Sequence, residues 1–245
     1  MLQLENVVPL GRSLDEYREM FLLSEVDLDK SIIGVGDGPA SFNAEMAALG
    51  KTVVSVDPLY AFTAAEIERQ FYAIADLMIE RIRATPDDWV WSYHKSPDDL
   101  RKHRRQVMMK FVADFETAKT GGRYVVGELP NLDFEDNRFE LALCSHFLFI
   151  YSDHFTYEFH RSSVLEMLRV ASEVRIFPLL TGASRQGRSA AEHAQIAHKV
   201  SPYVQPLIEE LVSAGYSVGV ETVRYEVQKG GNQMIRISTH GQRKA

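Results

Sequence analysis

The stretch from Ser31 to Pro58 constrains the fold more than any other part of the sequence. It opens on a short apolar run, Ser31–Ile33, which predicts a buried strand, and Gly34, Gly36 and Gly38 follow directly. Three glycines in five residues favour a tight turn whose backbone comes close to a ligand, because glycine has no Cβ to obstruct the approach. The segment therefore predicts a ligand-binding loop at the end of the first strand.

The residues after this loop complete a strand–helix–strand unit. A helix is predicted over residues 39–49, since Pro39 stands at its start and Gly50 just past its end. The β-branched run Thr52–Val56 predicts a second strand, which ends at Asp57. This acid follows the glycine loop by about 20 residues, the offset at which a carboxylate binds ribose hydroxyls in nucleotide-binding folds. An open α/β sheet with a nucleotide-like ligand is the expectation.

The glycine pattern differs from that of dinucleotide-binding proteins, which need Gly or Ala where this chain has Pro39. Gly-x-Gly-x-Gly followed by Val-Asp-Pro resembles the class I S-adenosylmethionine-dependent methyltransferases. The resemblance implies that the loop passes under the methionine part of S-adenosyl-L-methionine, that the acid binds the ribose, and that the residues after it contact the adenine. Because this cofactor has no pyrophosphate, its loop does not need to present a helix N-terminus. The cofactor contacts implied here are Gly34, Gly36, Asp37, Gly38, Asp57, Pro58 and Leu59.

Residues 123–148 continue the resemblance. Tyr124–Val126 predicts the third strand, and Glu128 matches an acid that accepts a hydrogen bond from the adenine amino group, with the Leu129 backbone as a donor to the ring. Residues 139–144 predict the fourth strand. Ser145 and His146 leave that strand at the carboxyl edge of the sheet, where ligands of such folds bind.

His146 is the candidate general base, because an imidazole titrates near neutral pH. The alternative is a histidine in the cofactor wall or the core. Tyr151 follows in the same loop and is a candidate substrate contact.

The resemblance implies that residues 1–25 form an N-terminal helical lid over the cofactor. Ser13 and Glu16 form a capping box that opens a helix running to about Leu23. The resemblance implies that Arg12 or Tyr17 contacts the methionine end of the cofactor, and Arg12 suits its carboxylate. The alternative is a surface arginine and a half-buried tyrosine.

Residues 61–120 are interpreted as a helical cap insertion. Capping residues Thr63 and Ser96 open two amphipathic helices, and the linker between them holds both tryptophans of the chain. Trp91 and Tyr93 are candidate substrate contacts in an apolar pocket wall. The equal alternative is that the tryptophans only fasten the helices to the body.

The net charge and the cysteine count limit the kinds of ligand and partner that the sequence predicts. The net charge of −7 argues against nucleic acid and favours a small-molecule acceptor, although the run 101–105 is basic. Cys144 is the only cysteine, which excludes an internal disulfide and a cysteine-cluster metal site, and no metal is expected. No apolar run approaches a membrane span, and the N-terminus does not resemble a secretion signal, so a cytoplasmic protein is expected. Nothing in the sequence indicates an oligomeric state.

The sequence thus predicts one α/β domain over residues 1–245. It has a seven-stranded, mostly parallel sheet with helices on both faces, and segments 216–227 and 233–239 pair as a closing antiparallel hairpin. Residues 181–199 are polar and read as a mobile segment. The expected function is methyl transfer from S-adenosylmethionine to an unidentified acceptor. The alternatives are a non-catalytic domain that binds this cofactor, or an NAD(P)-linked oxidoreductase on a similar fold.

Overall fold

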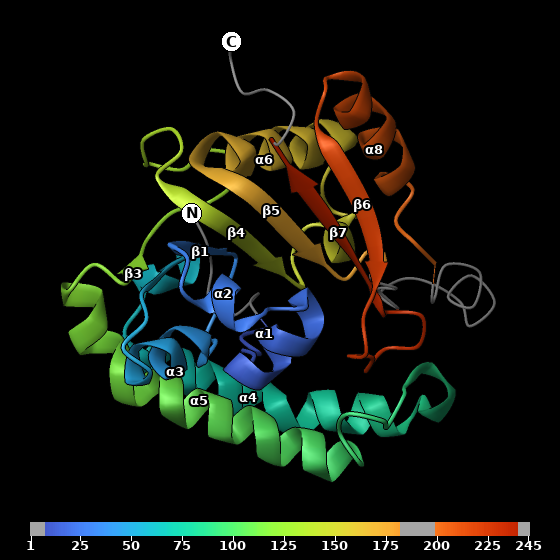
Figure 1. The fold of residues 1–245 in the computed structure, drawn as a ribbon. Helices are drawn as coiled ribbons and strands as arrows, with labels where there is room; N and C mark the ends of the chain where they lie inside the picture. The colour runs from blue at the N-terminus through green and yellow to red at the C-terminus, as the bar shows by residue number, and fades with distance from the viewer. Residues whose placement is uncertain (1–7, 182–198, 240–245) are drawn as a thin grey trace.

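The computed structural model describes residues 8–181 and 199–239, which form one mixed β-sheet with helices on both faces (Figure 1). The strand order is β3-β2-β1-β4-β5-β7-β6. Strands β1 to β5 run parallel to one another, and β7 runs antiparallel to both β5 and β6. The strands are β1 (Ile32–Val35), β2 (Val53–Val56), β3 (Tyr124–Val125), β4 (Phe139–Ser145), β5 (Ala171–Phe177), β6 (Ser217–Thr222) and β7 (Gln233–Ser238). The predicted fold class is confirmed.

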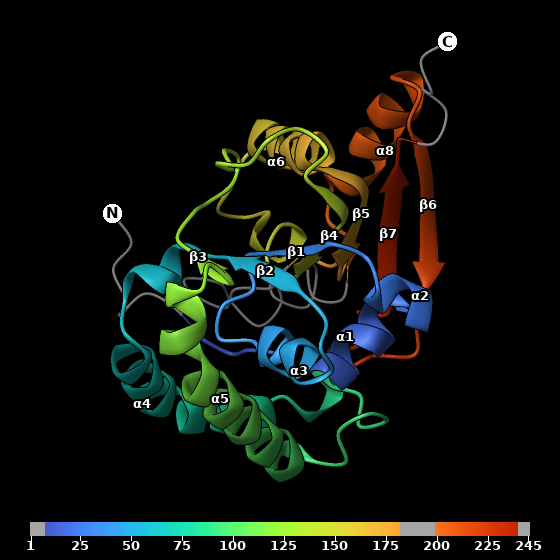
Figure 2. The ribbon, with the colours of Figure 1, turned by 60° about the vertical axis from the view of Figure 1, so that its left-hand side comes forward.

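The helices form two layers, which Figure 2 shows from a second direction. Helices α1 and α3 to α5 lie on one side of the sheet, and α6 and α8 lie on the other. The helices are α1 (Leu14–Phe21), α2 (Glu25–Leu28), α3 (Phe42–Ala48), α4 (Ala64–Arg83), α5 (Pro97–Thr120), α6 (Tyr157–Val170) and α8 (Val204–Ser213). Short 3-10 turns stand at Pro58–Ala61, Pro86–Asp88 and Phe149–Tyr151.

The middle of β1 and of β4 is apolar on both faces of the sheet because both faces are covered by helices. In β4, Ala142 and Cys144 face the core shared with α6 and α8, whereas Leu141 and Leu143 face the core shared with α1 and α3. All four side chains are fully buried. Parallel strands covered on both faces read as continuous apolar runs for this reason.

Helices α4 and α5 are the segment predicted to form a cap. Helix α5 packs on α3 and β3, and α4 packs on α5, so the segment also makes the crossover from β2 to β3. Phe111 and Phe115 of α5 join Tyr60 and Tyr124 in an aromatic cluster with ring centroids 4.7–6.3 Å apart. Part of the predicted insertion therefore shares a hydrophobic cluster with Tyr124 of β3 and with Tyr60 after β2.

Two predicted boundaries are wrong. Helix α3 begins at Phe42 with Ser41 as its N-cap, not at Pro39. Strand β6 ends at Thr222 rather than near Val227. The chain leaves the sheet there because the following segment pairs with the α4–α5 linker, where the Val90 amide donates to the Val227 carbonyl at 2.8 Å.

No helix in the described ranges is long and apolar enough to cross a bilayer. The segment predicted to be mobile at 181–199 lies outside the described residues apart from its two ends.

Phe111→Ala should lower the free energy of unfolding of the whole domain by about 3–5 kcal/mol, because a fully buried aromatic ring would be lost from the core. Urea denaturation would measure this change. Met109→Ala on the same helix is the matched control, since Met109 is 62% exposed, and it should change stability by less than about 0.5 kcal/mol. A cap that unfolds separately from the sheet would instead give two transitions, with only one of them shifted.

Candidate functional site

A cavity of about 630 Å³ opens at the carboxyl ends of β1, β2 and β4. This volume lies within the range of small-molecule sites, about 300–1,000 Å³. The predicted site residues that line it are Arg12, Gly36, Asp37, Gly38, Asp57, Pro58, Leu59, Glu128, Leu129, Ser145, His146 and Tyr151. Gly34, Tyr17, Trp91 and Tyr93 do not line it.

Asp57 ends β2 and presents a carboxylate that two backbone amides hold in place. The amides of Gly38 and Leu59 each donate to one of its oxygens at 2.8 Å. Each oxygen keeps acceptor capacity, because a carboxylate has about four lone-pair positions. Burial raises the pKa of Asp57 to about 6, although the two amide hydrogen bonds oppose the rise. The arrangement suits a pair of hydroxyl donors on a ligand.

Asp37 fastens the glycine loop to its surroundings. Its carboxylate accepts hydrogen bonds from the Tyr17 hydroxyl at 2.6 Å and from the Ser55 hydroxyl at 2.7 Å. A Cβ added to Gly34 would lie 1.9 Å from an Asp37 oxygen, so glycine is needed where the side chain folds back. Burial raises the pKa of Asp37 to about 6. Tyr17 is fully buried and supports the loop from behind the cavity wall.

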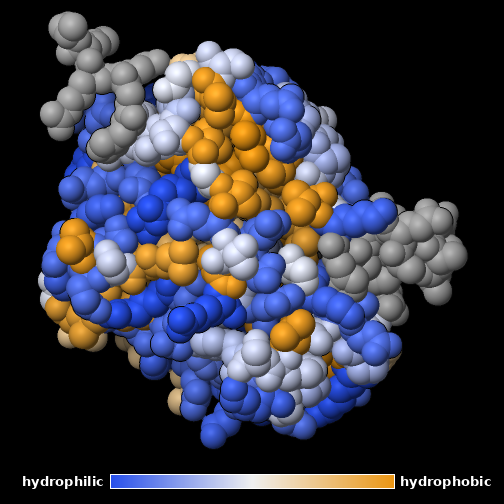
Figure 3. All heavy atoms as spheres, turned by 45° about the vertical axis from the view of Figure 1, so that its right-hand side comes forward, coloured by the Kyte–Doolittle hydropathy of each residue, from blue (hydrophilic) through white to orange (hydrophobic). Residues whose placement is uncertain are grey.

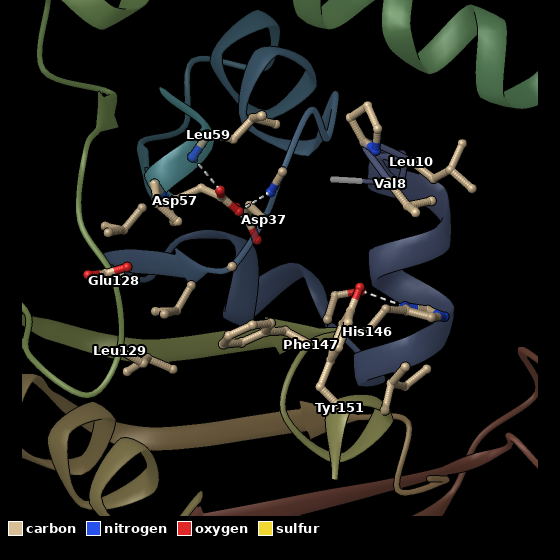
Figure 4. Close-up of a pocket in the computed structure, with 18 of the residues that line it drawn as sticks. Val8, Leu10, Asp37, Asp57, Leu59, Glu128, Leu129, His146, Phe147 and Tyr151 are labelled. Atoms are coloured by element: carbon tan, nitrogen blue, oxygen red, sulfur yellow. Dashed lines mark hydrogen bonds between the residues drawn. The ribbon is translucent and has the colours of Figure 1, made fainter. Parts of the chain in front are cut away.

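The cavity has two chemically different ends, as Figure 4 shows. Asp57 and Glu128 lie toward one side with Leu59 and Leu129, whereas His146 lies toward the other. The far end also holds Tyr151, Val8 and Leu10. Phe147 lies between the two ends against Gly36, where an added Cβ would come within 3.1 Å of the ring. One end is therefore acidic and the other is mainly apolar.

His146 is a neutral imidazole in this site. Burial is the main cause that holds its pKa well below the usual range, and the nearby Arg12 and Arg104 charges add to the effect. Its Nδ1 lies 2.9 Å from the Ser145 hydroxyl, and that hydroxyl also lies within donor distance of Met20 Sδ at 3.8 Å. When Ser145 donates to the sulfur, Nδ1 donates to Ser145 and Nε2 carries the lone pair.

Arg12 is the cation of the cavity wall. Its guanidinium donates to the Leu10 carbonyl, while its Nε is buried with no hydrogen-bond partner. No carboxylate among residues 8–181 and 199–239 forms an ion pair with it. Burial, and after it the charge of Arg104, lowers the pKa of Arg12 from its usual value. A ligand carboxylate would relieve this unpaired charge.

The aromatic linker between α4 and α5 lies outside the cavity wall. Trp91 packs with Trp89 on a small cluster of Ile79, Ile82 and Leu100, between α4 and α5. Tyr93 donates to Asp15 at 2.5 Å and contacts the Tyr225 ring. The structure therefore gives the linker the packing role that was one of the two alternatives.

Several wall residues were not predicted, because their sequence context carries no motif. They are Val8, Pro9, Leu10, Val35, Pro39, Val56, Met78, Gly127, Phe147, Ile150, Phe155 and Phe159. Phe147 and Phe155 contact the Tyr151 ring, and Phe159 stacks on Phe155. The only sequence signal for these wall residues is the run of aromatic residues that follows the predicted fourth strand.

The chain is similar in sequence to a protein of Methanocaldococcus jannaschii that is named uncharacterized protein MJ0045. The two are 30% identical over 237 residues, which cover 96% of this chain and 98% of the relative. No protein-family model matches the chain.

Solved structures are similar at lower identity. A Methanococcus maripaludis protein, solved as a candidate S-adenosyl-L-methionine-dependent methyltransferase, has a TM-score of 0.47 at 15% identity, covering 95% of this chain and 85% of that chain. The PH0226 protein of Pyrococcus horikoshii has a TM-score of 0.44 at 13% identity, with coverages of 89% and 85%. The magnesium protoporphyrin IX methyltransferase of Synechocystis, solved with bound S-adenosylmethionine, has a TM-score of 0.40 at 11% identity, with coverages of 85% and 69%.

Tyr17→Phe should raise the pKa of Asp37 above about 6, because the tyrosine hydroxyl donates to the carboxylate and favours its charged form. A ¹³C NMR titration of the Asp37 carboxyl would measure the change. Tyr72→Phe is the control, since Tyr72 is exposed on α4 and should leave the titration unmoved. An unchanged Asp37 titration in Tyr17→Phe would contradict the hydrogen bond.

Proposed function

The chain belongs to the same family as the uncharacterized protein MJ0045, and we propose that it is an S-adenosylmethionine-dependent methyltransferase. The observation that carries the proposal is the pairing of Asp57 with the glycine loop at the mouth of β1 and β2. The carboxylate lies in the cavity wall, held by the Gly38 and Leu59 amides, with acceptor positions left for a ribose diol.

The loop itself favours this cofactor over a dinucleotide. Helix α3 begins at Phe42, four residues beyond Gly38, so its N-terminus is not placed directly behind the loop. Asp37 and Asp57 both stand at the loop, and two carboxylates there disfavour a pyrophosphate. S-adenosylmethionine has no phosphate and carries a positively charged sulfur, which suits such surroundings.

The adenine and the amino-acid part of S-adenosylmethionine would occupy opposite ends of the cavity. The adenine would lie beside Leu59, Glu128 and Leu129, which Figure 4 shows on the same side as Asp57. The amino-acid end would extend toward the opposite side, where Arg12, which has no carboxylate partner in the described part of the chain, offers a cation for its carboxylate.

Bound S-adenosylmethionine supplies an electrophilic methyl group, and the protein must align an acceptor with it and exclude water. The residues at the far end of the cavity suit that task. Leu10, Met78 and Tyr151 form an apolar wall that favours a small, largely apolar acceptor. A neutral His146 beside that wall would accept the acceptor's proton at Nε2.

S-adenosylmethionine and its demethylated product S-adenosylhomocysteine should each raise the thermal midpoint of the protein. At about 100 times its dissociation constant, a ligand adds roughly 2.7 kcal/mol to the stability of the folded state. For a domain of this size the shift is on the order of 5–10 °C. Differential scanning fluorimetry would measure it, and calorimetric titration would give the dissociation constant.

Asp57→Ala should abolish most of this shift, whereas Asp133→Ala, an exposed acid after β3, should keep it. If NADH raised the thermal midpoint while S-adenosylmethionine and S-adenosylhomocysteine did not, the result would favour an oxidoreductase over a methyltransferase. Binding without turnover over a broad panel of acceptors would favour a non-catalytic cofactor-binding domain.

Binding of S-adenosylhomocysteine should weaken as the pH falls through about 6. Burial raises the pKa of the unliganded Asp57 to about 6, and ribose hydroxyls donate to its charged form, so protonation below that pH opposes binding. The dissociation constant should be about tenfold larger at pH 5 than at pH 7.5. Calorimetric titration at both pH values would measure the ratio.

The matched control is Asp57→Asn, which should bind weakly and show a smaller ratio between the two pH values. Asp37 also titrates near pH 6 and leaves a residual dependence in that variant. A wild-type affinity that does not change between pH 5 and pH 7.5 would contradict a charged Asp57 as the ribose acceptor.

A further inference from the structure

A buried polar cluster lies beside the cavity, and its residues do not line the cavity. Its centre is Glu16 of α1, whose side chain is completely buried. Arg104 of α5 donates to both carboxylate oxygens, at 2.7 and 2.6 Å, and Tyr225 donates to one of them at 2.6 Å. His103 Nε2 lies 3.0 Å from the other oxygen. Residues from α1, α5 and the segment after β6 thus converge on one carboxylate.

The same cluster holds the cavity-lining segment 8–12. Arg104 also donates to the Gly11 carbonyl at 3.1 Å, and the Ser13 amide donates to Glu16 at 2.9 Å. A Cβ on Gly11 would lie 1.9 Å from the Pro39 carbonyl oxygen, so the segment lies directly against the glycine loop. The Ser41 amide donates to the Arg12 carbonyl at 3.0 Å and fixes the segment from the other side.

The cluster also decides which arginine is paired. Glu16 is the carboxylate that acts electrostatically on both Arg12 and Arg104, but its oxygens are bonded to Arg104. A bidentate pair of this kind is geometrically specific. Arg12 is left in the cavity wall without a carboxylate partner among residues 8–181 and 199–239.

We propose that Glu16, Arg104 and Tyr225 are positioning residues that hold segment 8–12 over the cavity and keep Arg12 unpaired for the carboxylate of the ligand. This proposal rests on the proposed function, because the carboxylate in question is that of the amino-acid end of S-adenosylmethionine. The cluster acts through Arg12 and touches no ligand itself.

Two ligands separate this role from general stability. S-adenosylhomocysteine carries the amino-acid end, and 5′-methylthioadenosine has the same adenosine and sulfur but lacks it. The ratio of their dissociation constants therefore reports how well Arg12 is placed. Calorimetric titration of both ligands with the full chain would measure it.

Wild type should prefer S-adenosylhomocysteine, and Arg12→Gln should weaken that ligand by about tenfold while changing the affinity for methylthioadenosine less than about twofold. Tyr225→Phe, which loses one hydroxyl from the cluster, should weaken S-adenosylhomocysteine by about threefold to tenfold with the same selectivity. Arg104→Lys keeps the positive charge but loses the bidentate hydrogen bonds of the guanidinium. It should also weaken the binding of S-adenosylhomocysteine more than that of methylthioadenosine.

Arg105→Lys is the matched control, because Arg105 is the partly exposed neighbour of Arg104 and pairs with Asp76 at the surface. It should leave both affinities unchanged. Tyr225→Phe is a small change that should keep the fold, so this variant tests the positioning role even if Arg104→Lys does not fold.

The outcomes keep the two proposals apart. A wild type that binds neither ligand overturns the proposed function. A wild type that prefers S-adenosylhomocysteine, with the preference unchanged in Arg12→Gln or in Tyr225→Phe, overturns the positioning role alone. Equal weakening of both ligands in Tyr225→Phe also overturns it, because that result indicates loss of the cavity as a whole.

Discussion

The contact between the Asp37 carboxylate and Gly34 is the constraint on which the rest of the site depends. The side chain folds back over a position where any Cβ would collide, and Tyr17 and Ser55 hold it there. These bonds tie the glycine loop to α1 on one side and to β2 on the other. A buried carboxylate with two donors is stable, whereas one without them would carry an uncompensated desolvation penalty.

The geometry of the ligand wall follows from that fixed loop. With the loop held, the Gly38 amide points at Asp57, and the Leu59 amide completes the support of the same carboxylate. The Tyr60 hydroxyl donates to the Gly38 carbonyl at 2.7 Å, so the loop is also tied to the aromatic cluster on α5. The helices outside the sheet therefore stabilise the site as well as the core.

Charged and polar residues cover most of the face shown in Figure 3, and one contiguous apolar area lies in the upper part of that view. Val212 and Val220 are among the large apolar side chains exposed in the described part of the chain.

Short-range sequence patterns predicted the fold class and the part of the site around Asp57. The glycine loop and Asp57 lie close together in the sequence and obey a spacing set by one strand–helix–strand unit, and the capping boxes at Ser13 and Thr63 are present. Features that depend on distant residues were missed. Glu16 and Arg104 lie 88 positions apart, so the first was recognised only as a capping residue and the second only as part of a basic run.

The end of β6 illustrates the same limit. The residues after Thr222 have β-propensity and were predicted to extend the strand, but Tyr225 is buried against Glu16 instead. Tertiary packing overrides local propensity in strands especially often. Trp91 and Tyr93 were misplaced for a similar reason, since their partners lie on α4, α1 and the segment after β6.

A crystal structure of the protein grown with S-adenosylhomocysteine would test the central claim most directly. The account predicts the ligand in the cavity, with both ribose hydroxyls within hydrogen-bond distance of Asp57, the adenine beside Leu59 and Glu128, and the carboxylate at Arg12. A ligand bound outside the cavity, or inside it with the ribose turned away from Asp57, would contradict the account.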